Sequence, residues 1–207
     1  MPGSPSRDCL RRALATTPPE VPLLGERRAA IALILVELAE SFEVLLIERA
    51  VREGDPWSGH MALPGGHVDP SDADPGAAAE REALEEVGLD LRRFGKRLGR
   101  LSDLTPARGV AIAVRPFVYL LETRPALSLS SEVERALWVP IAPLRAGEQR
   151  TTHRLSRAGQ QLDFPAWDID GRVVWGLTYR VLDELFERLN LVSSSERASL
   201  DNSQQPR

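Results

Sequence analysis

The sequence predicts a single α/β domain in which a glutamate-rich helix lies between strands along the chain. Three observations lead to this fold class. The aliphatic run AAIALILVEL begins at Ala29 and is followed by EVLLIER at 43–49, which predicts two paired strands. The segment AAAEREALEEV from Ala77 has the alanine, leucine and glutamate content that favours helix. The segment WGLTYRVLDELFERL at 175–189 places apolar residues at helical spacing, which predicts a closing amphipathic helix.

The length and composition are typical of one domain with loose ends. The chain has 207 residues with 43% hydrophobic content, which is enough for one substantial core. Residues 1–26 combine a short helical stretch with the Pro-rich sequence TTPPEVP and are expected to form an N-terminal surface arm. The domain is expected to span residues 27–192, because residues 193–207 lack apolar periodicity and predict a disordered tail.

Turn signals and further strands complete the domain. A polar turn is expected at 40–42, and a polar loop at 54–56 leads to WSGHMALPGG, where adjacent glycines permit unusual backbone angles. Gly88 predicts the end of the glutamate-rich helix. Beyond it, GVAIAVRPFVYLL at 109–121 predicts a long central strand, and ALWVPI at 136–141 predicts a shorter one.

Charge, hydropathy and cysteine content exclude several classes of partner. With 26 basic and 30 acidic residues the net charge is −4, so no global field attracts a nucleic acid or an anionic membrane. The most apolar run, Ala29 to Val36, is much shorter than the roughly 20 residues of a spanning helix. Cys9 is the only cysteine, which excludes an internal disulfide and fits a reducing, cytoplasmic compartment.

Several common catalytic motifs are absent. His60, His67 and His153 raise the question of zinc, but the chain has no HExxH, and solvated or loop histidines are the favoured interpretation. The P-loop motif GxxxxGK[ST] is missing, and Lys96, the only lysine, has no such context. The GxSxG motif of serine hydrolases is missing too.

The spacing of the helical glutamates indicates a metal site. Residues three and four apart share a helical face, so Glu82, Glu85 and Glu86 are expected to converge while Glu80 points elsewhere. Like charges on one face repel unless a cation lies between them, and carboxylate oxygens suit hard divalent cations. The alternative is a solvated acidic helix face, which the run EREALEE alone would favour.

The longer string GGHVDPSDADPGAAAEREALEEVGL at 65–89 resembles the Nudix box. That motif is G-x5-E-x7-R-E-U-x-E-E-x-G-U, in which U is an aliphatic residue. Its second half is filled by Arg81, Glu82, Ala83, Glu85, Glu86, Gly88 and Leu89. In its first half, Asp72 stands in place of the glutamate, and eight residues instead of seven separate it from Arg81.

The pattern GG-x-x-DP-x-D resembles the coenzyme A pyrophosphatase branch of the Nudix hydrolases, matched here by Gly65, Gly66, Asp69, Pro70 and Asp72. The sequences LPGG, LLIER, WVP and WGLTYRVL also resemble that branch, so the resemblance covers most of residues 29–190. Residues 50–60 depart from the branch's usual sequence.

The resemblance implies a fold, a cofactor and a reaction. It implies an α/β/α sandwich with a mixed sheet between helices, and hydrolysis of the pyrophosphate linkage of a small-molecule nucleoside diphosphate derivative, coenzyme A or a related species first. It assigns Mg²⁺ or Mn²⁺ to Glu82 and Glu86, with Glu85 as a further ligand. Glu85 and Glu86 are the candidate catalytic residues, and Arg81 is expected to hold the glutamates in place. The alternatives are hydrolysis of ADP-ribose or a dinucleotide, and a non-catalytic nucleotide-binding module.

Residues outside the helix are candidates for substrate contact. Arg49 and the backbone of Gly65 and Gly66 are expected to contact phosphate or to order the loop around it, although Arg49 could equally form a surface salt bridge. Trp57 could stack on a base, although a partly buried anchor is the commoner role for a tryptophan. Glu132 is a further candidate to reach the metal.

Overall fold

The computed structural model describes residues 5–19, 27–38, 41–54, 57–105, 112–157 and 160–203, with the backbone alone for residues 157 and 196–203. The expected turn residue Glu40, the loop residues 55 and 56, the start of the strand predicted at 109, and residues 20–26 of the expected arm lie outside these ranges.

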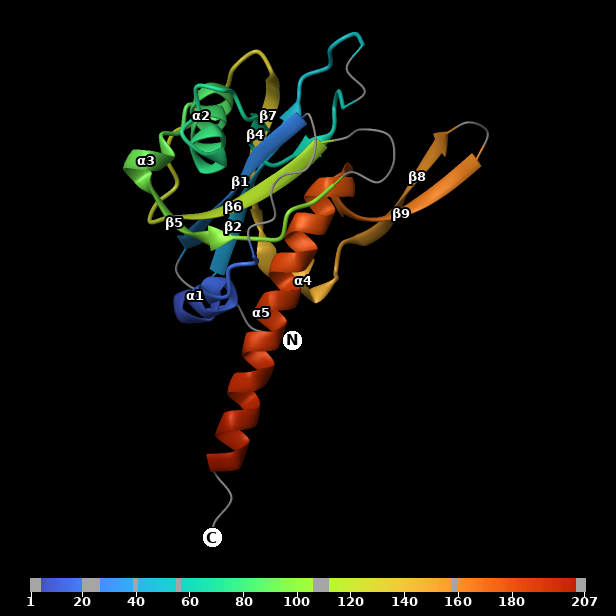
Figure 1. Ribbon diagram of the computed structural model, residues 1–207. Helices are drawn as coiled ribbons and strands as arrows, with labels where there is room; N and C mark the ends of the chain where they lie inside the picture. The colour runs from blue at the N-terminus through green and yellow to red at the C-terminus, as the bar shows by residue number, and fades with distance from the viewer. Residues whose placement is uncertain are drawn as a thin grey trace.

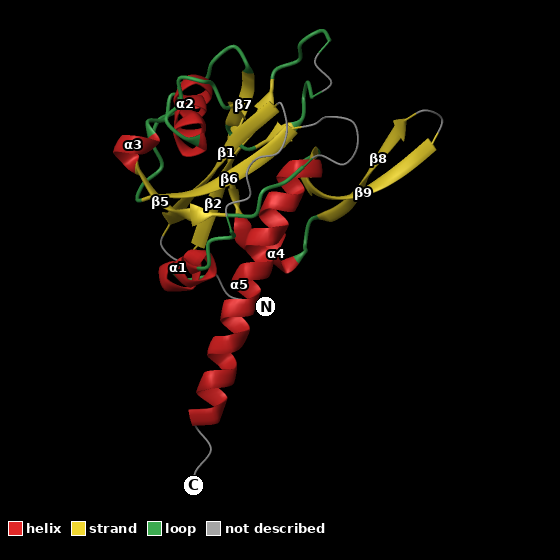
Figure 2. Cartoon of the chain, viewed as in Figure 1, coloured by secondary structure: helices red, strands yellow, loops and turns green. Residues whose placement is uncertain are grey.

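The described residues form two sheets and five helices (Figures 1 and 2). The strands are β1 (Arg27–Leu38), β2 (Ser41–Arg49), β3 (Met61–Ala62), β4 (Gly65–His67), β5 (Gly95–Arg100), β6 (Ile112–Leu121), β7 (Val133–Pro140), β8 (Arg150–Arg157), β9 (Gln160–Ile169) and β10 (Arg172–Trp175). The helices are α1 (Arg7–Ala15), α2 (Pro75–Val87), α3 (Leu91–Phe94), α4 (Ile141–Ala146) and α5 (Gly176–Ser203).

The larger sheet is mixed and has seven strands. Its main path is β3-β2-β1-β6-β5, in which β1 and β6 run parallel while the other neighbours are antiparallel. Strand β4 pairs with β1, and β7 pairs with β2. The pairing of β1 with β2 was predicted from the sequence and is confirmed.

Side chains of β1 alternate between two cores, one on each face of the sheet. Leu33 and Leu35 pack with α1, α4 and α5, whereas Ala32 and Ile34 pack with α2. Figure 1 shows α2 and α3 on one side of the sheet and α1 and α5 on the other. The expected α/β/α arrangement with a mixed sheet between helices is therefore confirmed.

The first helix differs from the surface arm that the sequence predicts for residues 1–26. In α1 the side chains of Cys9, Leu10, Ala13 and Leu14 are buried, and they belong to the core on the α5 side of the sheet. An amphipathic face of one short helix buries these four residues against α5. The helix α1 is thus part of the folded domain.

The last helix also extends beyond its predicted end. Helix α5 continues to Ser203, although the sequence predicted a disordered tail from residue 193. Adding residues to an existing helix needs no new nucleus, and the hydroxyls of Ser193, Ser194 and Ser195 each donate to the carbonyl four residues earlier. No helix in the described part of the chain is long and apolar enough to cross a membrane.

The smaller sheet, with strand order β10-β9-β8, was not predicted. Strands β8 and β9 form a long hairpin that projects from the body of the molecule in Figure 1. Its base is fixed by Trp167, which is fully buried and stacks on Tyr179 of α5 at a ring distance of 4.2 Å.

The burial of α1 predicts a large effect of truncating one of its side chains. Leu10 is 1% exposed, so Leu10→Ala should lower the free energy of unfolding by about 2–5 kcal/mol, measured by chemical denaturation. The control is Arg11→Ala, since Arg11 is exposed and forms an exposed ion pair with Asp8. Equal stability of the two variants would contradict the packing of α1 into the core.

Candidate active site

Helix α2 is fixed at both ends, which sets the direction of its glutamates. Asp74 caps its start by accepting from the Ala77 backbone N–H at 2.9 Å. Gly88 ends it in the left-handed conformation at φ 68°, and the Gly88 N–H donates to Leu84 O. The helix packs closely on the sheet because Ala79 and Ala83 are fully buried against it. Glu82 and Glu86 lie against the glycines of β4.

The glycine loop lies directly against these glutamates. Gly65 and Gly66 form β4 opposite Ile31 and Ala30 of β1. Gly65 has φ 151°, and a Cβ there would overlap the backbone of β1, so this position requires glycine. A Cβ on Gly66 would instead overlap the Glu82 carboxylate. The glycines, predicted as substrate-binding residues, are the reason that loop and helix can approach so closely.

The Gly65 backbone N–H donates to Glu86 Oε2 at 2.9 Å. This hydrogen bond links the loop to the helix through one of the predicted metal ligands. It also fixes one carboxylate oxygen of Glu86.

Arg81 connects the loop, the helix and Asp72. Its Nε and Nη2 donate to the two Asp72 carboxylate oxygens, both at 3.1 Å, in a bidentate pair. Its Nη1 donates to Glu82 Oε1 at 2.9 Å and to Glu85 Oε2 at 3.0 Å. The predicted positioning role of Arg81 agrees with these contacts. Asp72 acts through Arg81, a role that sequence reasoning left open because the residue departs from the Nudix pattern.

Burial and repulsion perturb the glutamates to different degrees. Glu86 is 4% exposed, and burial raises the pKa of its carboxyl to about 7. The Gly65 N–H and the Arg49 charge lower that pKa, whereas the charges of Glu82 and Glu132 raise it. Burial also raises the pKa of Glu82, against the opposing effect of Arg81. Glu85 is the most exposed of the three, with 58% of its side chain accessible.

The donor set fits a hard divalent cation. Glu82 and Glu86 bring two carboxylates, one helical turn apart, into a partly dehydrated site where their charges repel. Within the described ranges, no three His, Cys, Asp or Glu side chains already stand in a metal-binding arrangement. The side chains that would hold the ion are engaged by Arg81 and Gly65. Full coordination would therefore include water or substrate oxygens.

Of the other predicted site residues, Arg49 and Glu132 lie near Glu86, whereas Trp57 lies in a different part of the structure. The charges of Arg49 and Glu132 both act on Glu86, so these residues belong to its surroundings. Glu132 also forms an exposed ion pair with Arg52 at 3.0 Å. Trp57 is 47% exposed and lies edge-on to His60, in a separate aromatic cluster. Glu80 points away as expected and accepts a hydrogen bond from Tyr119 Oη.

Substitution by alanine is predicted to have different effects at Gly65 and at Gly66. Gly65→Ala should lower the melting temperature, because its Cβ would overlap the backbone of β1. Gly66→Ala should retain the fold and lose Mg²⁺ and Mn²⁺ binding, because only the flexible Glu82 carboxylate must move. Thermal denaturation and calorimetric metal titration measure the two effects. Full metal binding by a folded Gly66→Ala variant would contradict the role assigned to the loop.

The raised pKa of Glu86 predicts a pH-dependent stability without divalent metal. Between pH about 4.5 and 7 the folded state holds a proton that the unfolded state has lost, so stability falls as pH rises through this window. The loss should reach up to roughly 3 kcal/mol, from about 1.4 kcal/mol per pH unit of difference. In Glu86→Gln this contribution should be absent. Denaturation curves of both proteins in EDTA at pH 5 to 8 test this, and parallel pH profiles would refute it.

The chain is similar in sequence to several known proteins. The chain is 43% identical over 114 residues to an uncharacterized protein of Schizosaccharomyces pombe, of which it spans 35% of the length. It is 29% identical to the uncharacterized Nudix hydrolase NudL of Photorhabdus laumondii, covering 89% of this chain and 97% of that one. It is 30% identical to NudL of Salmonella newport, covering 78% of this chain and 82% of that one.

Two solved structures share the fold. One is a MutT/nudix family protein from Enterococcus faecalis, with a TM-score of 0.50 and 19% identity over 84% of this chain and 65% of that one. The other is the Nudix hydrolase RenU from M. smegmatis, with a TM-score of 0.50 and 16% identity over 83% of this chain and 88% of that one. The NUDIX domain model matches residues 25–158, more than half of the chain. This protein therefore belongs to the NUDIX family of hydrolases.

Proposed function

We propose that this protein hydrolyses the pyrophosphate linkage of a nucleoside diphosphate derivative, and that coenzyme A or a related CoA species is the substrate. The observation that carries the proposal is the pair of carboxylates of the half-buried Glu82 and the buried Glu86, held against the Gly65–Gly66 loop. A helix needs no such pair for its own stability, because burying like charges costs free energy. The pair is explained by a ligand of opposite charge.

Glu82 and Glu86, with Glu85, are proposed to hold Mg²⁺ or Mn²⁺. When bound, such an ion neutralises phosphate charge and lowers the pKa of a coordinated water. Both effects address the barrier to hydrolysis, since the negative oxygens of a diphosphate repel an incoming nucleophile. The oxygen-only donor set favours these hard cations over zinc.

The chain's own residues supply positioning and proton transfer. Arg81 holds the Glu82 and Glu85 carboxylates, which restricts them to one arrangement. Glu85 is exposed beside Glu82 and Glu86, so it can accept a proton from an attacking water and release it to solvent. Glu86 is the other candidate base, because it lies one helical turn from Glu82 beside the glycine loop. Arg49 and the glycine backbone are proposed to contact the substrate phosphates.

The coenzyme A assignment is supported by the residues that the chain shares with that branch. Gly65, Gly66 and Asp69 lie in the loop beside the glutamates. Asp69 forms a tight turn with Ser71, whose backbone N–H it accepts at 2.8 Å. Asp72 holds Arg81. The extra residue between Asp72 and Arg81 is thus accommodated without loss of the link to the glutamates.

One assay separates the candidate substrates. Purified protein with Mg²⁺ or Mn²⁺ is incubated with coenzyme A, ADP-ribose, NADH and oxidised nucleotides, and the products are identified. Release of 3′,5′-ADP and 4′-phosphopantetheine is the expected result. Turnover of another compound alone would replace the coenzyme A assignment. Binding of a nucleotide without any turnover would replace the enzyme by a binding module.

The same assay tests the site. Glu86→Gln should reduce metal-dependent turnover on the order of 10²-fold or more, because one carboxylate of the buried pair is lost. The matched control is Glu80→Gln on the same helix, since Glu80 contacts Tyr119 and Arg92 instead of the site. The control should retain activity within a few-fold. Similar activity in both variants would discard the site assignment.

A further inference from the structure

The sequence WGLTYRVL lies at the junction of β10 and α5, and the hydrolytic chemistry described above does not use it. Strand β10 ends at Trp175, and α5 begins at Gly176 with φ 65°. This left-handed backbone favours glycine and turns the chain from strand into helix. The turn places Thr178, the third residue of α5, against Met61 of β3.

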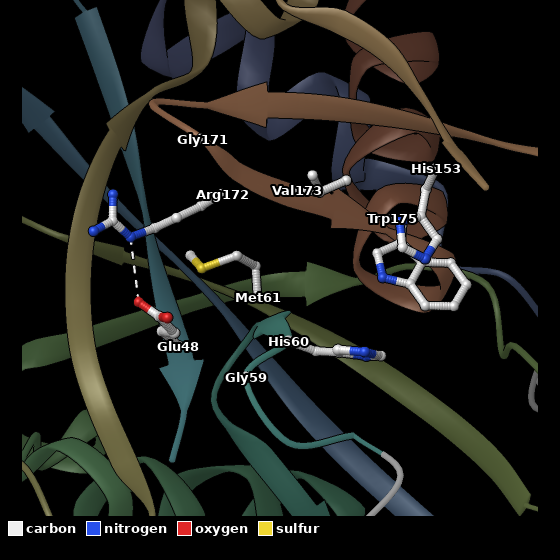
Figure 3. Close-up of a pocket in the computed structure, with 9 residues that line it drawn as sticks. All are labelled: Glu48, Gly59, His60, Met61, His153, Gly171, Arg172, Val173 and Trp175. Atoms are coloured by element: carbon white, nitrogen blue, oxygen red, sulfur yellow. Dashed lines mark hydrogen bonds and ion pairs between the residues drawn. The ribbon is translucent and has the colours of Figure 1, made fainter. Parts of the chain in front are cut away.

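Trp175 packs beside the start of β3. It lines a cavity of about 250 Å³ between the two sheets, which we call the aromatic cavity (Figure 3). The Trp175 ring is packed against His60, His153 and Phe164, at centroid distances of 5.3, 4.0 and 5.5 Å. Because His60 immediately precedes Met61, this packing holds the start of β3 next to the start of α5.

The backbone carbonyl of Met61 needs a partner outside the large sheet. Strand β3 is a two-residue strand at the end of the sheet path, and Met61 lies opposite Glu48 of β2. The Arg49 N–H donates to the His60 carbonyl at 3.1 Å, so the adjacent pair of Glu48 and Met61 is a non-hydrogen-bonded pair. The Met61 carbonyl therefore points away from β2.

Thr178 supplies the partner for this carbonyl. Its hydroxyl donates to Met61 O at 3.2 Å, and both residues are buried, with exposed fractions of 8% for Thr178 and 4% for Met61. A buried carbonyl that has lost its water and gained no donor costs free energy. This hydrogen bond therefore stabilises β3 in its position against α5.

Strand β3 leads directly into the glycine loop. Gly65 follows Met61 by four residues, and its N–H donates to Glu86 Oε2 at 2.9 Å. Between these two residues, the Pro64 carbonyl accepts from the Ala32 N–H of β1 at 2.8 Å. A segment this short, held at several points, moves as a unit. A displacement of Met61 is therefore transmitted to Gly65.

We propose that Thr178 is a positioning residue of the hydrolytic site, because its hydroxyl fixes β3 and thereby the place of the glycine loop against Glu82 and Glu86. It acts from the far side of the sheet, since Met61 belongs to the core on the α5 side. The importance of this link for hydrolysis rests on the proposed function. The coupling between Thr178 and the loop does not depend on that function.

The test measures hydrogen exchange of the Gly65 amide by NMR, in full-length protein without divalent metal. Thr178→Val keeps the shape of the side chain and removes the hydroxyl, so the Met61 carbonyl loses its donor. Exchange at Gly65 should accelerate about tenfold, on the scale of one buried hydrogen bond. Thr178→Ser keeps a hydroxyl and should exchange at nearly the rate of the unmodified protein.

A matched control separates positioning from general stability. Leu189 lies on the same helix, about 16 Å along its axis from Thr178, and is 0% exposed. Leu189→Ala should therefore lower the stability of the whole domain. The Leu35 amide, in the centre of β1, reports global unfolding. Leu189→Ala should accelerate exchange at Leu35 without a local increase at Gly65, whereas Thr178→Val should show that local increase.

Calorimetric titration with Mn²⁺ is the second readout. Thr178→Val should weaken Mn²⁺ binding at least about threefold, because the displaced loop no longer orders the Glu86 carboxylate. Thr178→Ser and Leu189→Ala should bind Mn²⁺ as the unmodified protein does. Absence of Mn²⁺ binding by the unmodified protein would contradict the proposed function, and the exchange experiment would still decide the role of Thr178.

A second variant keeps the test decisive if Thr178→Val does not fold. Gly176→Ala has open space for its Cβ but strains the left-handed turn, so it should loosen the same contact and accelerate exchange at Gly65. Unchanged Gly65 exchange in both variants would overturn the proposal. Equal acceleration in Thr178→Ser and Thr178→Val would overturn it too, because the hydroxyl would then not be the cause.

Discussion

The repulsion between the Glu82 and Glu86 carboxylates is the constraint on which the site depends. Both groups are partly removed from water beside the glycine loop, and Glu86 is almost fully buried. Arg81 compensates Glu82, whereas Glu86 has the Gly65 N–H and the more distant charge of Arg49. The net cost appears as the raised pKa of Glu86. Free energy of folding is thus stored in a site that a cation can relieve.

Small residues make this proximity possible. Ala30 and Ala32 of β1 face Ala79 and Ala83 of α2, so the helix lies close to the sheet. Gly66 then leaves room for the Glu82 carboxylate. Larger side chains at these positions would move the helix outward and separate the carboxylates from the loop. The alanine-rich start of the helix is therefore a geometric requirement of the site as well as a source of helix propensity.

The parts of the structure that are encoded locally could be predicted from the sequence. The capping residues, composition and spacing of α2 lie within one short segment, and so do the aliphatic runs of β1 and β2. The small sheet was missed because β8 and β9 alternate polar and apolar residues only weakly, and because its strands pair with one another and not with the large sheet. The buried face of α1 and the cavity depend on contacts between distant segments, which composition does not report. The link from Asp72 to Arg81 also needed coordinates, because the spacing departs from the family pattern.

The end of β2 lies beside both the glutamate site and the cavity between the two sheets. Its pairing with β7 shifts register between Glu48 and Arg49, and such irregularities re-aim side chains beside functional sites. Glu48 faces the aromatic cavity, while the charge of Arg49 acts on Glu86. Two consecutive residues thus contribute to opposite faces of the sheet.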